Sequence, residues 1–425
     1  MAPWRTLAVS VLLSVVLVAG AAGARGAGGA GEFKIYPQAG ILWQDLYPAN
    51  FVDLDPGPGI RDFACGTQTY DGHTGTDTTI RSFREMDIGV PVFAALGGRV
   101  LSVQDGEYDR NFGPRAPPYD NHVVLEHGTG RFTIYGHLRR GIELKRGQRV
   151  AAGQQIGWTA SSGNSSWPHL HFTSQVASEV VEPWAGPCNE MPSGWAVQAA
   201  YPTEPYVRDL ALSDRPFAKK ADLPYDRSVR RGSFVAGPRT VYVRVELGLL
   251  SGSPGLHFRF LRPDGSTALD ETPSVAFQVH NGIGYTRYAR RVTLRPLGRW
   301  RFVVDLGGRT VADAPFDVVR QPRDVRNRPP NAIGAELVPP APTSSDVVQC
   351  RVRTSLVTED PDYDIVRYRY RWTVGERIVR AVTSAALSDV LREGAAATGK
   401  ELWCTVVPSD GRLAGPPTSA GVAVR

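Results

Sequence analysis

The sequence predicts a mainly β protein in which a small antiparallel β domain is followed by two β-sandwich domains. The chain has 425 residues, which is more than one ordinary domain needs. Its apolar runs are short and are separated by Gly, Pro and Asn turn signals, as strands are. Residues 34–206 contain no long segment with helical periodicity. Apolar residues make up 42% of the chain, enough for several hydrophobic cores.

The first 24 residues have the pattern of a secretory signal peptide. Arg5 precedes an apolar run at 7–18, and a stretch of Ala and Gly then leads to Ala24. We expect cleavage after Ala24 and a secreted chain, extracellular or periplasmic. The alternative is an uncleaved membrane anchor, but the apolar run is short for a bilayer. No later run is long and apolar enough to span a membrane, so the mature chain should have no stable membrane span.

The segment 34–206 is expected to form the first β domain. Two alternating apolar runs, 122–127 and 131–138, flank Gly128–Gly130 and predict a β-hairpin. Further short strands are expected at 91–95, 98–103 and 168–174.

The remainder of the chain is expected to form two sandwiches joined by linkers. Residues 207–232 are polar and mixed, and 321–345 are rich in Pro, Arg and Asn, so both are interpreted as linkers. Between them, closely spaced strands predict a β-sandwich at 233–320. Residues 346–425 contain a Cys, then Trp372, then a second Cys, and this order resembles that of an immunoglobulin-like module.

Four cysteines fit an exported chain, where disulfides persist. We expect Cys65 to pair with Cys188 and Cys350 with Cys404, because each bridge then stays within one predicted domain. Four free buried thiols are the alternative.

A formal net charge of +6 would draw an exported protein towards polyanions such as cell-wall polymers. The sequence has no basic cluster interleaved with aromatic residues and no common nucleic-acid-binding motif, so nucleic acid is not an expected partner.

Five residues in the first domain could form a metal-dependent hydrolytic site. On a strand, His169 and His171 would point to the same face. His73 and Asp77 are four residues apart in a segment rich in Gly and Thr, and His137 ends the second hairpin strand. Two imidazoles and a carboxylate make a zinc site that leaves a fourth position for water, and zinc lowers the pKa of that water to roughly 7. The spare histidines suit proton transfer.

The motifs around these residues resemble those of lysostaphin-type zinc endopeptidases, which cut bacterial cell-wall peptides. They occur in order between about 72 and 172, roughly a quarter of the chain. The matching runs are His73-Thr-Gly-Thr-Asp77, Gly89-Val-Pro-Val-Phe-Ala-Ala, Gly98-Arg-Val, Val123-Val-Leu-Glu-His-Gly, Tyr135-Gly-His-Leu138, Gly147-Gln-Arg-Val, Gly153-Gln-Gln-Ile-Gly157 and Pro168-His-Leu-His-Phe172.

The resemblance implies a small antiparallel β domain of the duplicated hybrid motif type with its site in a groove. It implies that His73, Asp77 and His171 bind Zn²⁺ and that His137 and His169 are the catalytic histidines. The sequence departs from the family's pattern at Trp167 and Thr173, where relatives have Gly and an acidic residue. These changes bear on the substrate. A longer loop at 105–120 and an insertion at 83–86 are further differences.

Other polar residues are interpreted as structural. His122 and His127 lie around the hairpin turn, and His257 and His280 lie in the second domain. Tyr135 could donate a hydrogen bond in the groove or only pack. The alternate aspartates Asp360, Asp362 and Asp364 could chelate Ca²⁺, but a solvated acidic turn is the favoured interpretation.

Together these observations predict a secreted zinc endopeptidase that hydrolyses stem or cross-bridge peptides of peptidoglycan. The C-terminal modules are expected to hold it on a cell surface or partner. The alternatives are a catalytically silent cell-wall-binding scaffold or adhesin, and a peptidase of Gly-rich proteins.

Overall fold

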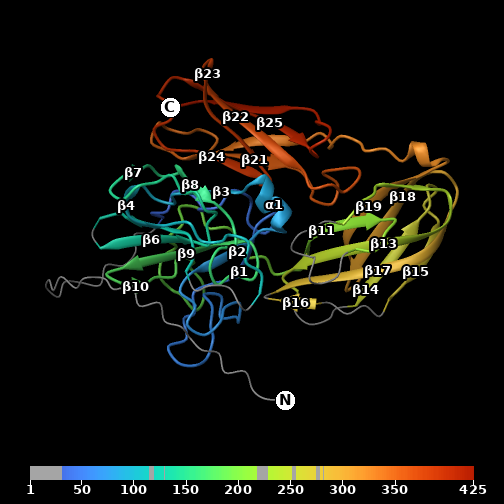
Figure 1. Ribbon diagram of the computed structural model, residues 1–425, viewed down its shortest axis with the longest axis horizontal. Helices are drawn as coiled ribbons and strands as arrows, with labels where there is room; N and C mark the ends of the chain where they lie inside the picture. Colours follow the sequence, from blue (N-terminus) through green and yellow to red (C-terminus); the bar gives the residue numbers. More distant parts are fainter. Residues whose placement is uncertain are drawn as a thin grey trace.

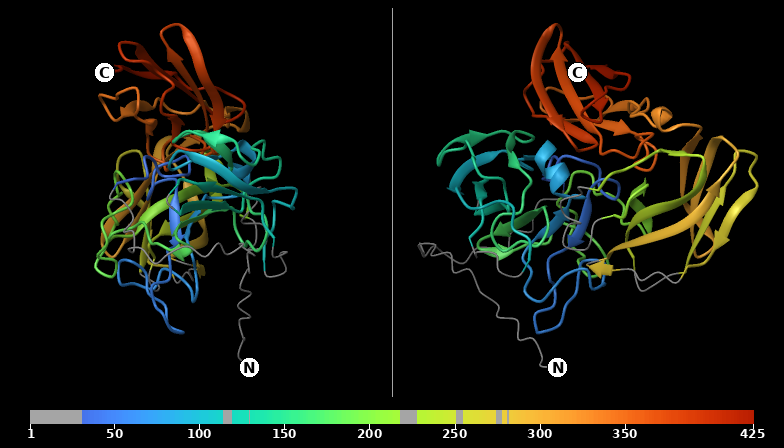
Figure 2. Two further views of the ribbon diagram at one scale, coloured as in Figure 1. Left: turned by 90° about the vertical axis from the view of Figure 1, so that its left-hand side faces the viewer. Right: turned by 45° about the vertical axis from the view of Figure 1, so that its right-hand side comes forward.

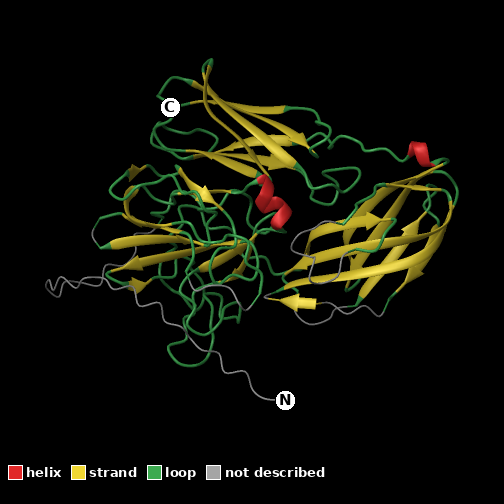
Figure 3. Cartoon of the chain, in the orientation of Figure 1, coloured by secondary structure: helices red, strands yellow, loops and turns green. Residues whose placement is uncertain are grey.

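Strands dominate the computed structural model, which describes residues 31–113, 119–128, 130–217, 228–250, 255–273, 278–280 and 282–425 (Figures 1 and 3). The expected signal peptide at 1–24 lies outside the described residues. Within them the mainly β class is confirmed, and the helical elements are the short α1 (Phe83–Ile88) and η2 (Pro322–Asp324). None of the described helices has the length and apolar character needed to cross a bilayer.

The first domain is built on an eight-stranded sheet in the order β1-β2-β9-β6-β5-β4-β7, with β10 paired to β9. The predicted hairpin is present as β5 and β6, which pair antiparallel. Trp184, Tyr135 and Phe172 are buried in the core on this sheet. A separate two-stranded sheet pairs β3 with β8. The strands are β1 (Tyr47–Asn50), β2 (Thr76–Thr79), β3 (Pro91–Phe93), β4 (Gly98–Gln104), β5 (His122–Glu126), β6 (Arg131–Gly136), β7 (Arg149–Val150), β8 (Gln155–Trp158), β9 (His169–Val176) and β10 (Glu179–Val180).

The second domain packs two sheets, β11-β13-β17-β16 and β12-β19-β18-β14-β15, around one hydrophobic core that includes Trp300 and Phe302. Its first strand corrects the predicted linker at 207–232. Residues 207–213 belong to β11, which pairs along β13, and residues 208–213 are buried. The strands are β11 (Tyr206–Ser213), β12 (Ser233–Val235), β13 (Gly237–Gly248), β14 (Leu256–Leu261), β15 (Thr267–Glu271), β16 (Gln278–His280), β17 (Ile283–Leu294), β18 (Gly298–Leu306) and β19 (Arg309–Val319).

The third domain also packs two sheets, β20-β21-β24 and β23-β22-β25-β26. Trp372 is fully buried in its core and lies opposite Cys404 on the neighbouring strand. Strand β20 corrects the predicted linker at 321–345, because residues 334–338 pair with β21. The strands are β20 (Gly334–Val338), β21 (Val348–Arg353), β22 (Arg367–Val374), β23 (Arg377–Ser384), β24 (Ser388–Leu391), β25 (Glu401–Ser409) and β26 (Thr418–Ala423).

Both expected disulfides are confirmed. Cys65 and Cys188 are bonded with their Cα atoms 5.2 Å apart, and this bridge joins two loops of the first domain. Cys350 and Cys404 are bonded with their Cα atoms 6.4 Å apart, and this bridge joins β21 of one sheet to β25 of the other. Each bridge therefore closes within one domain.

The third domain is packed directly on the first (Figure 2). One hydrophobic cluster contains Phe83 and Phe93 of the first domain together with Val347, Ala385 and Val390 of the third. Backbone groups complete the contact: the N–H of Leu387 donates to Asp45 Oδ2 at 2.7 Å, and the N–H of Gly40 donates to Ser388 Oγ at 2.9 Å. The two domains share a core and are not separate modules on a flexible tether.

A buried ion-pair network lies where the three domains meet. Arg81, two residues beyond β2, forms an ion pair with Glu85 of α1, and its Nη2 lies 3.6 Å from Glu359 of the third domain. Asp209 of β11 also acts electrostatically on the Arg81 guanidinium. Burial raises the pKa of the Glu359 carboxyl to about 7, even though Arg81 opposes that shift.

This raised pKa predicts that stability falls as the pH increases. Between its ordinary pKa near 4.5 and about 7, Glu359 holds a proton in the folded state that the unfolded chain has released. Raising the pH through this window should therefore lower the free energy of unfolding, by on the order of 3 kcal/mol. Denaturant titrations of Glu359→Gln at pH 5, 6, 7 and 8 should show a flatter dependence. The exposed Glu376→Gln is the matched control, and equal slopes in the two variants would contradict the prediction.

Candidate active site

The pairing of β2 with β9 brings a carboxylate and two imidazoles to one face of the sheet. Asp77 lies directly opposite His171, and Thr79 lies opposite His169. Residues opposite one another in an antiparallel pair share a face, as do residues two apart on one strand. His171 Nδ1 consequently lies 2.8 Å from Asp77 Oδ1, and His169 Nε2 lies 3.5 Å from the same oxygen.

His73 reaches this cluster from the loop that precedes β2. Its Nδ1–H donates to the carbonyl oxygen of Phe51 at 2.7 Å, which leaves Nε2 free to act as a ligand. That Nε2 lies 3.2 Å from Asp77 Oδ2 and 3.3 Å from His171 Nδ1. Gly75 allows the close approach, because a Cβ there would lie 2.8 Å from His171 Nε2 and 2.6 Å from a backbone oxygen.

His73, Asp77 and His171 form a donor set that fits a zinc ion. Ligand atoms that each lie about 2.0–2.1 Å from zinc at the corners of a tetrahedron are about 3.3 Å apart. His73 Nε2 lies 3.2 Å from Asp77 Oδ2 and 3.3 Å from His171 Nδ1, close to that value, and His171 Nδ1 lies 2.8 Å from the other carboxylate oxygen, Asp77 Oδ1. Within the described residues, this is the group of three His, Cys, Asp or Glu side chains that could hold a metal. The predicted ligands therefore lie together, and a tetrahedral ion there would keep one position for water.

Two neighbouring side chains hold these ligands, and the sequence analysis did not predict their roles. Asn50 of β1 donates from Nδ2 to Asp77 Oδ2 at 2.9 Å, and Thr173 Oγ1 lies 2.9 Å from His171 Nε2. Such contacts fix the orientation and the tautomer of a ligand. Thr173 had a sequence signal, since it departs from the family's pattern. Asn50 had no sequence signal, because only the pairing of β1 with β2 brings it to the site.

The two expected catalytic histidines lie beside the cluster, with their ring centroids 4.4 Å apart. His169 donates from Nδ1 to the carbonyl oxygen of Trp167 at 2.7 Å, so its Nε2 faces Asp77. His137 donates from Nδ1 to the carbonyl oxygen of Ser162 at 2.7 Å, which leaves its Nε2 for proton transfer. The structure thus brings all five predicted site residues together.

His137 has an uncommon backbone conformation that Asp120 stabilises. Its φ of 58° lies in the left-handed region, which non-glycine residues adopt mainly where the surroundings impose it. The His137 N–H donates to Asp120 Oδ2 at 2.8 Å, and His122 Nδ1 lies 3.0 Å from Asp120 Oδ1. Asp120 therefore holds the His137 backbone in place, a role that the sequence did not predict. His122 contacts Asp120 and none of the three candidate metal ligands.

Burial and charge separate the pKa values of the site residues. Burial would raise the pKa of Asp77, but the charges of His73 and His169 hold it well below its usual value, so Asp77 is ionised at neutral pH. Burial lowers the pKa of His137 to about 4, and the neighbouring His169 adds to that effect. Burial would also lower the pKa of His73, but Asp77 outweighs it and raises the pKa. Protons therefore compete with a metal for His73 in acid.

The lengthened loop at 105–120 supports the segment that contacts both catalytic histidines. The Asn111 N–H donates to the carbonyl oxygen of Ser161 at 2.9 Å, and the Ser161 N–H donates to that of Asp109 at 3.0 Å. Ser161 directly precedes Ser162, which accepts from His137, and Ser165 Oγ lies 3.3 Å from His169 Nδ1. Residues 109 and 111 of this loop therefore hold the segment that contacts His137 and His169.

The remaining candidates are structural. Tyr135 is fully buried and accepts the Ala95 N–H at 2.9 Å, so it packs in the core of the first domain. Asp360 accepts backbone N–H groups from Asp362 and Asp364. Asp362 is paired with Arg328 and Asp364 with Arg84, so the three carboxylates serve a turn and ion pairs.

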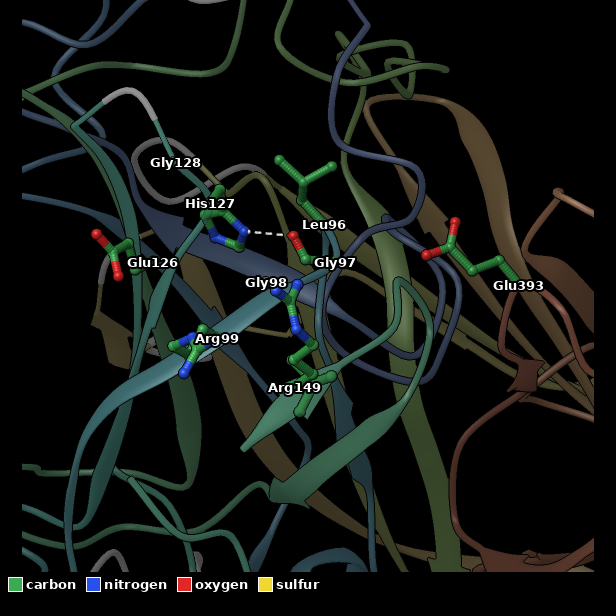
Figure 4. A pocket seen from close by; sticks show the side chains of 10 residues that line it. Leu96, Gly97, Gly98, Arg99, Glu126, His127, Gly128, Arg149 and Glu393 are labelled. Atoms are coloured by element: carbon green, nitrogen blue, oxygen red, sulfur yellow. Dashed lines mark hydrogen bonds between the residues drawn. The ribbon is translucent and has the colours of Figure 1, made fainter. Parts of the chain in front are cut away.

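A hollow of about 680 Å³ lies on β4, β5 and β7, at the far side of the sheet from β2 (Figure 4). Figure 4 shows His127 there, donating from Nδ1 to the Gly97 carbonyl oxygen at 2.8 Å. His127 Nε2 lies 2.7 Å from Thr133 Oγ1, so both nitrogens have partners, as a structural histidine requires. This hollow is separate from the metal cluster.

The geometry predicts that removing Asp77 removes metal binding. We expect Asp77→Ala to weaken zinc affinity by more than about 100-fold, because losing even an outer contact of a ligand costs 10–100-fold. Competitive titration with a zinc chelator would measure the change. Asp105→Ala is the matched control, since Asp105 accepts backbone N–H groups from Gly141 and Ile142 away from the site. Equal affinities in the two variants would contradict the predicted ligand set.

Comparison with known proteins agrees with this geometry. Residues 72–183, which include all five site residues, match the family described as Peptidase family M23. Peptidoglycan DD-endopeptidase ShyA of Vibrio cholerae serotype O1 is 34% identical over 109 residues, 26% of this chain and 21% of that protein. Cell division protein DipM of Caulobacter vibrioides is 35% identical over 94 residues, 22% of this chain and 15% of that protein. The chain thus spans about a fifth of the length of such relatives.

Among solved structures, the catalytic domain of the antimicrobial peptidase lysostaphin from Staphylococcus simulans is 27% identical. The alignment covers 32% of this chain and 86% of that domain, with a TM-score of 0.22. The family match coincides with the sheet that carries the five residues. Residues 72–183 of this chain are therefore similar to peptidase family M23.

Proposed function

We propose that the chain is an exported zinc endopeptidase that hydrolyses peptide bonds in peptidoglycan stem or cross-bridge peptides. The observation that carries the proposal is the convergence of His73, Asp77 and His171 within metal-binding distance, with His137 and His169 beside them. A catalytically silent scaffold would be supported by the loss of a metal ligand or a catalytic histidine. None of the five residue types is missing here, so this alternative is not favoured.

The proposed chemistry divides the work between a metal and two histidines. Bound zinc supplies a Lewis acid that polarises a carbonyl group and lowers the pKa of water. His137 and His169 each have Nδ1 held by a backbone carbonyl, so each presents Nε2 to the reacting groups. In that orientation they can accept a proton, return it to the leaving amine and donate a hydrogen bond to a developing oxyanion.

The substrate class is supported by the names of relatives and by charge. ShyA and ShyB of Vibrio cholerae are named peptidoglycan DD-endopeptidases, and each is 34% identical to this chain over the matched segment. A net charge of +6 favours association with anionic wall polymers. Two disulfides support export to an oxidising compartment. We further propose that the two C-terminal sandwiches position the site on the cell surface.

Zinc content and hydrolysis of purified peptidoglycan, measured together, test this function. The full chain should contain about one zinc and release new amino groups. His169→Ala should keep its zinc and lose about 10²–10⁴-fold in rate, whereas His171→Ala should lose both. His257→Ala is the matched control, because that histidine lies on β14 of the second domain.

Two other outcomes would point elsewhere. Zinc binding without hydrolysis of peptidoglycan or of a pentaglycine peptide would favour a silent scaffold. Hydrolysis of pentaglycine alone would favour a peptidase of Gly-rich substrates. A folded chain that binds no zinc would overturn the proposal.

Asp120 gives a separate prediction about positioning. Asp120→Ala removes the acceptor of the His137 N–H, so the strained backbone should relax and move the imidazole. We expect kcat to fall about 100-fold, a loss typical of a misplacement of about 1 Å, while zinc content is unchanged. Asp120→Asn keeps one acceptor oxygen and should recover part of the rate. Wild-type kcat in Asp120→Ala would show that His137 needs no such anchor.

A further inference from the structure

We propose that the junction of the three domains binds a small multivalent anion of the phosphate class. A cavity of about 220 Å³ lies there, apart from the metal cluster. All three domains and the second linker contribute to its lining. The lining residues are Arg84, Ser228, Val229, Arg230, Arg231, Val325, Arg326, Asn327, Asp362, Asp364 and Arg412.

The charge of the lining is strongly unbalanced. Five arginines line the cavity, and the acidic residues among the lining are two aspartates, which gives a formal charge of +3. Like charges that line one cavity repel one another, and two of these arginines, Arg326 and Arg412, also have exposed side chains that a dissolved anion can reach. An anion placed among them would relieve the repulsion.

Ion pairs within the protein do not neutralise all five arginines. Arg84 lies 3.8 Å from Asp364, Arg230 lies 2.8 Å from Asp209, and Arg231 lies 3.7 Å from Asp214. At that distance the Arg231 Nε, which is buried, makes no hydrogen bond. Asp362 is already paired with Arg328 at 2.9 Å, so it is not available to the others.

Arg326 and Arg412 bind neutral oxygens instead. Arg326 Nε donates to the carbonyl oxygen of Arg323 at 3.2 Å, and Arg412 Nη1 donates to Asn327 Oδ1 at 3.2 Å. In the part of the chain that the structure describes, neither guanidinium has a carboxylate within ion-pair distance. These two groups come from the second linker and from the β25–β26 turn, and they line the cavity together.

The donors and the cavity size define the ligand class. A guanidinium presents a planar fork of N–H donors that matches phosphate or sulfate oxygens in pairs. A volume of about 220 Å³ is below the roughly 300–1,000 Å³ of sites for drug-sized ligands. A free phosphate-type anion fits this space better than a segment of a phosphodiester polymer.

Such an anion would link the domains. Because the lining comes from all three, binding requires their native arrangement and should stabilise it by mass action. The inference is independent of the proposed hydrolysis, since it uses none of the five site residues.

Thermal unfolding of the full chain in inorganic phosphate tests the proposal, with sodium chloride of equal ionic strength as the reference. We expect phosphate to raise the wild-type midpoint by about 2–4 °C. Arg326→Ala/Arg412→Ala should abolish that rise. The matched control is Arg291→Ala/Arg377→Ala, which removes two exposed arginines on β17 and β23 and should keep it. His171→Ala should also keep it, which excludes phosphate bound at the metal cluster.

Calorimetric titration with phosphate should give one site per chain in the wild type and none in the pocket variant. A phosphodiester polymer, poly(glycerol phosphate), should leave the midpoint unchanged. The proposal would be overturned if phosphate raised the unfolding midpoint no more than chloride does, or raised it equally in Arg326→Ala/Arg412→Ala. It would also be overturned if only the polymer raised the midpoint. If the double alanine variant does not fold, Arg326→Lys/Arg412→Lys, which keeps charge but loses the fork, should bind phosphate more weakly than the wild type.

Discussion

The antiparallel pairing of β2 with β9 is the constraint on which the candidate site depends. Its register sets Asp77 against His171 and Thr79 against His169. A shift by one residue would turn every side chain of one strand to the other face, and the carboxylate would leave the imidazoles. Neighbours on both sides hold this register: β1 pairs with β2 and supplies Asn50, and β6 pairs with β9 and ends beside His137.

The same strand connects the site to the other two domains. Arg81 follows β2 after one intervening residue, and it is paired with Glu85 of α1 and with Glu359 of the third domain. Because these groups are buried, replacing Arg81 would leave the Glu85 carboxylate without its ion-pair partner, which costs more than the pair itself contributes. The accessory domains are therefore part of the structure that supports the site, in addition to any binding role.

Backbone segments near the candidate metal ligands let His73 approach His171 and hold His137 beside them. The loop before β2 brings His73 close through Gly75, where a side chain would collide with His171. The segment around Ser162 holds His137 on one side and is held by the inserted loop on the other. Backbone carbonyl oxygens accept from Nδ1 of both His137 and His169, so the orientations of the two rings are set by the fold.

From the sequence came the β class, the expected disulfide pairing, which the structure confirms, and five candidate site residues, because strand patterns, cysteine placement within domains and ordered motifs are local signals. Residues 207–213 and 334–338, which the sequence assigned to linkers, pair as strands and are buried or half-buried. Helix α1 is too short to give a periodic signal. Asn50, Asp120 and the arginine-lined junction depend on contacts between residues far apart in the chain. Only tertiary structure decides such contacts, because they arise from packing and not from sequence spacing.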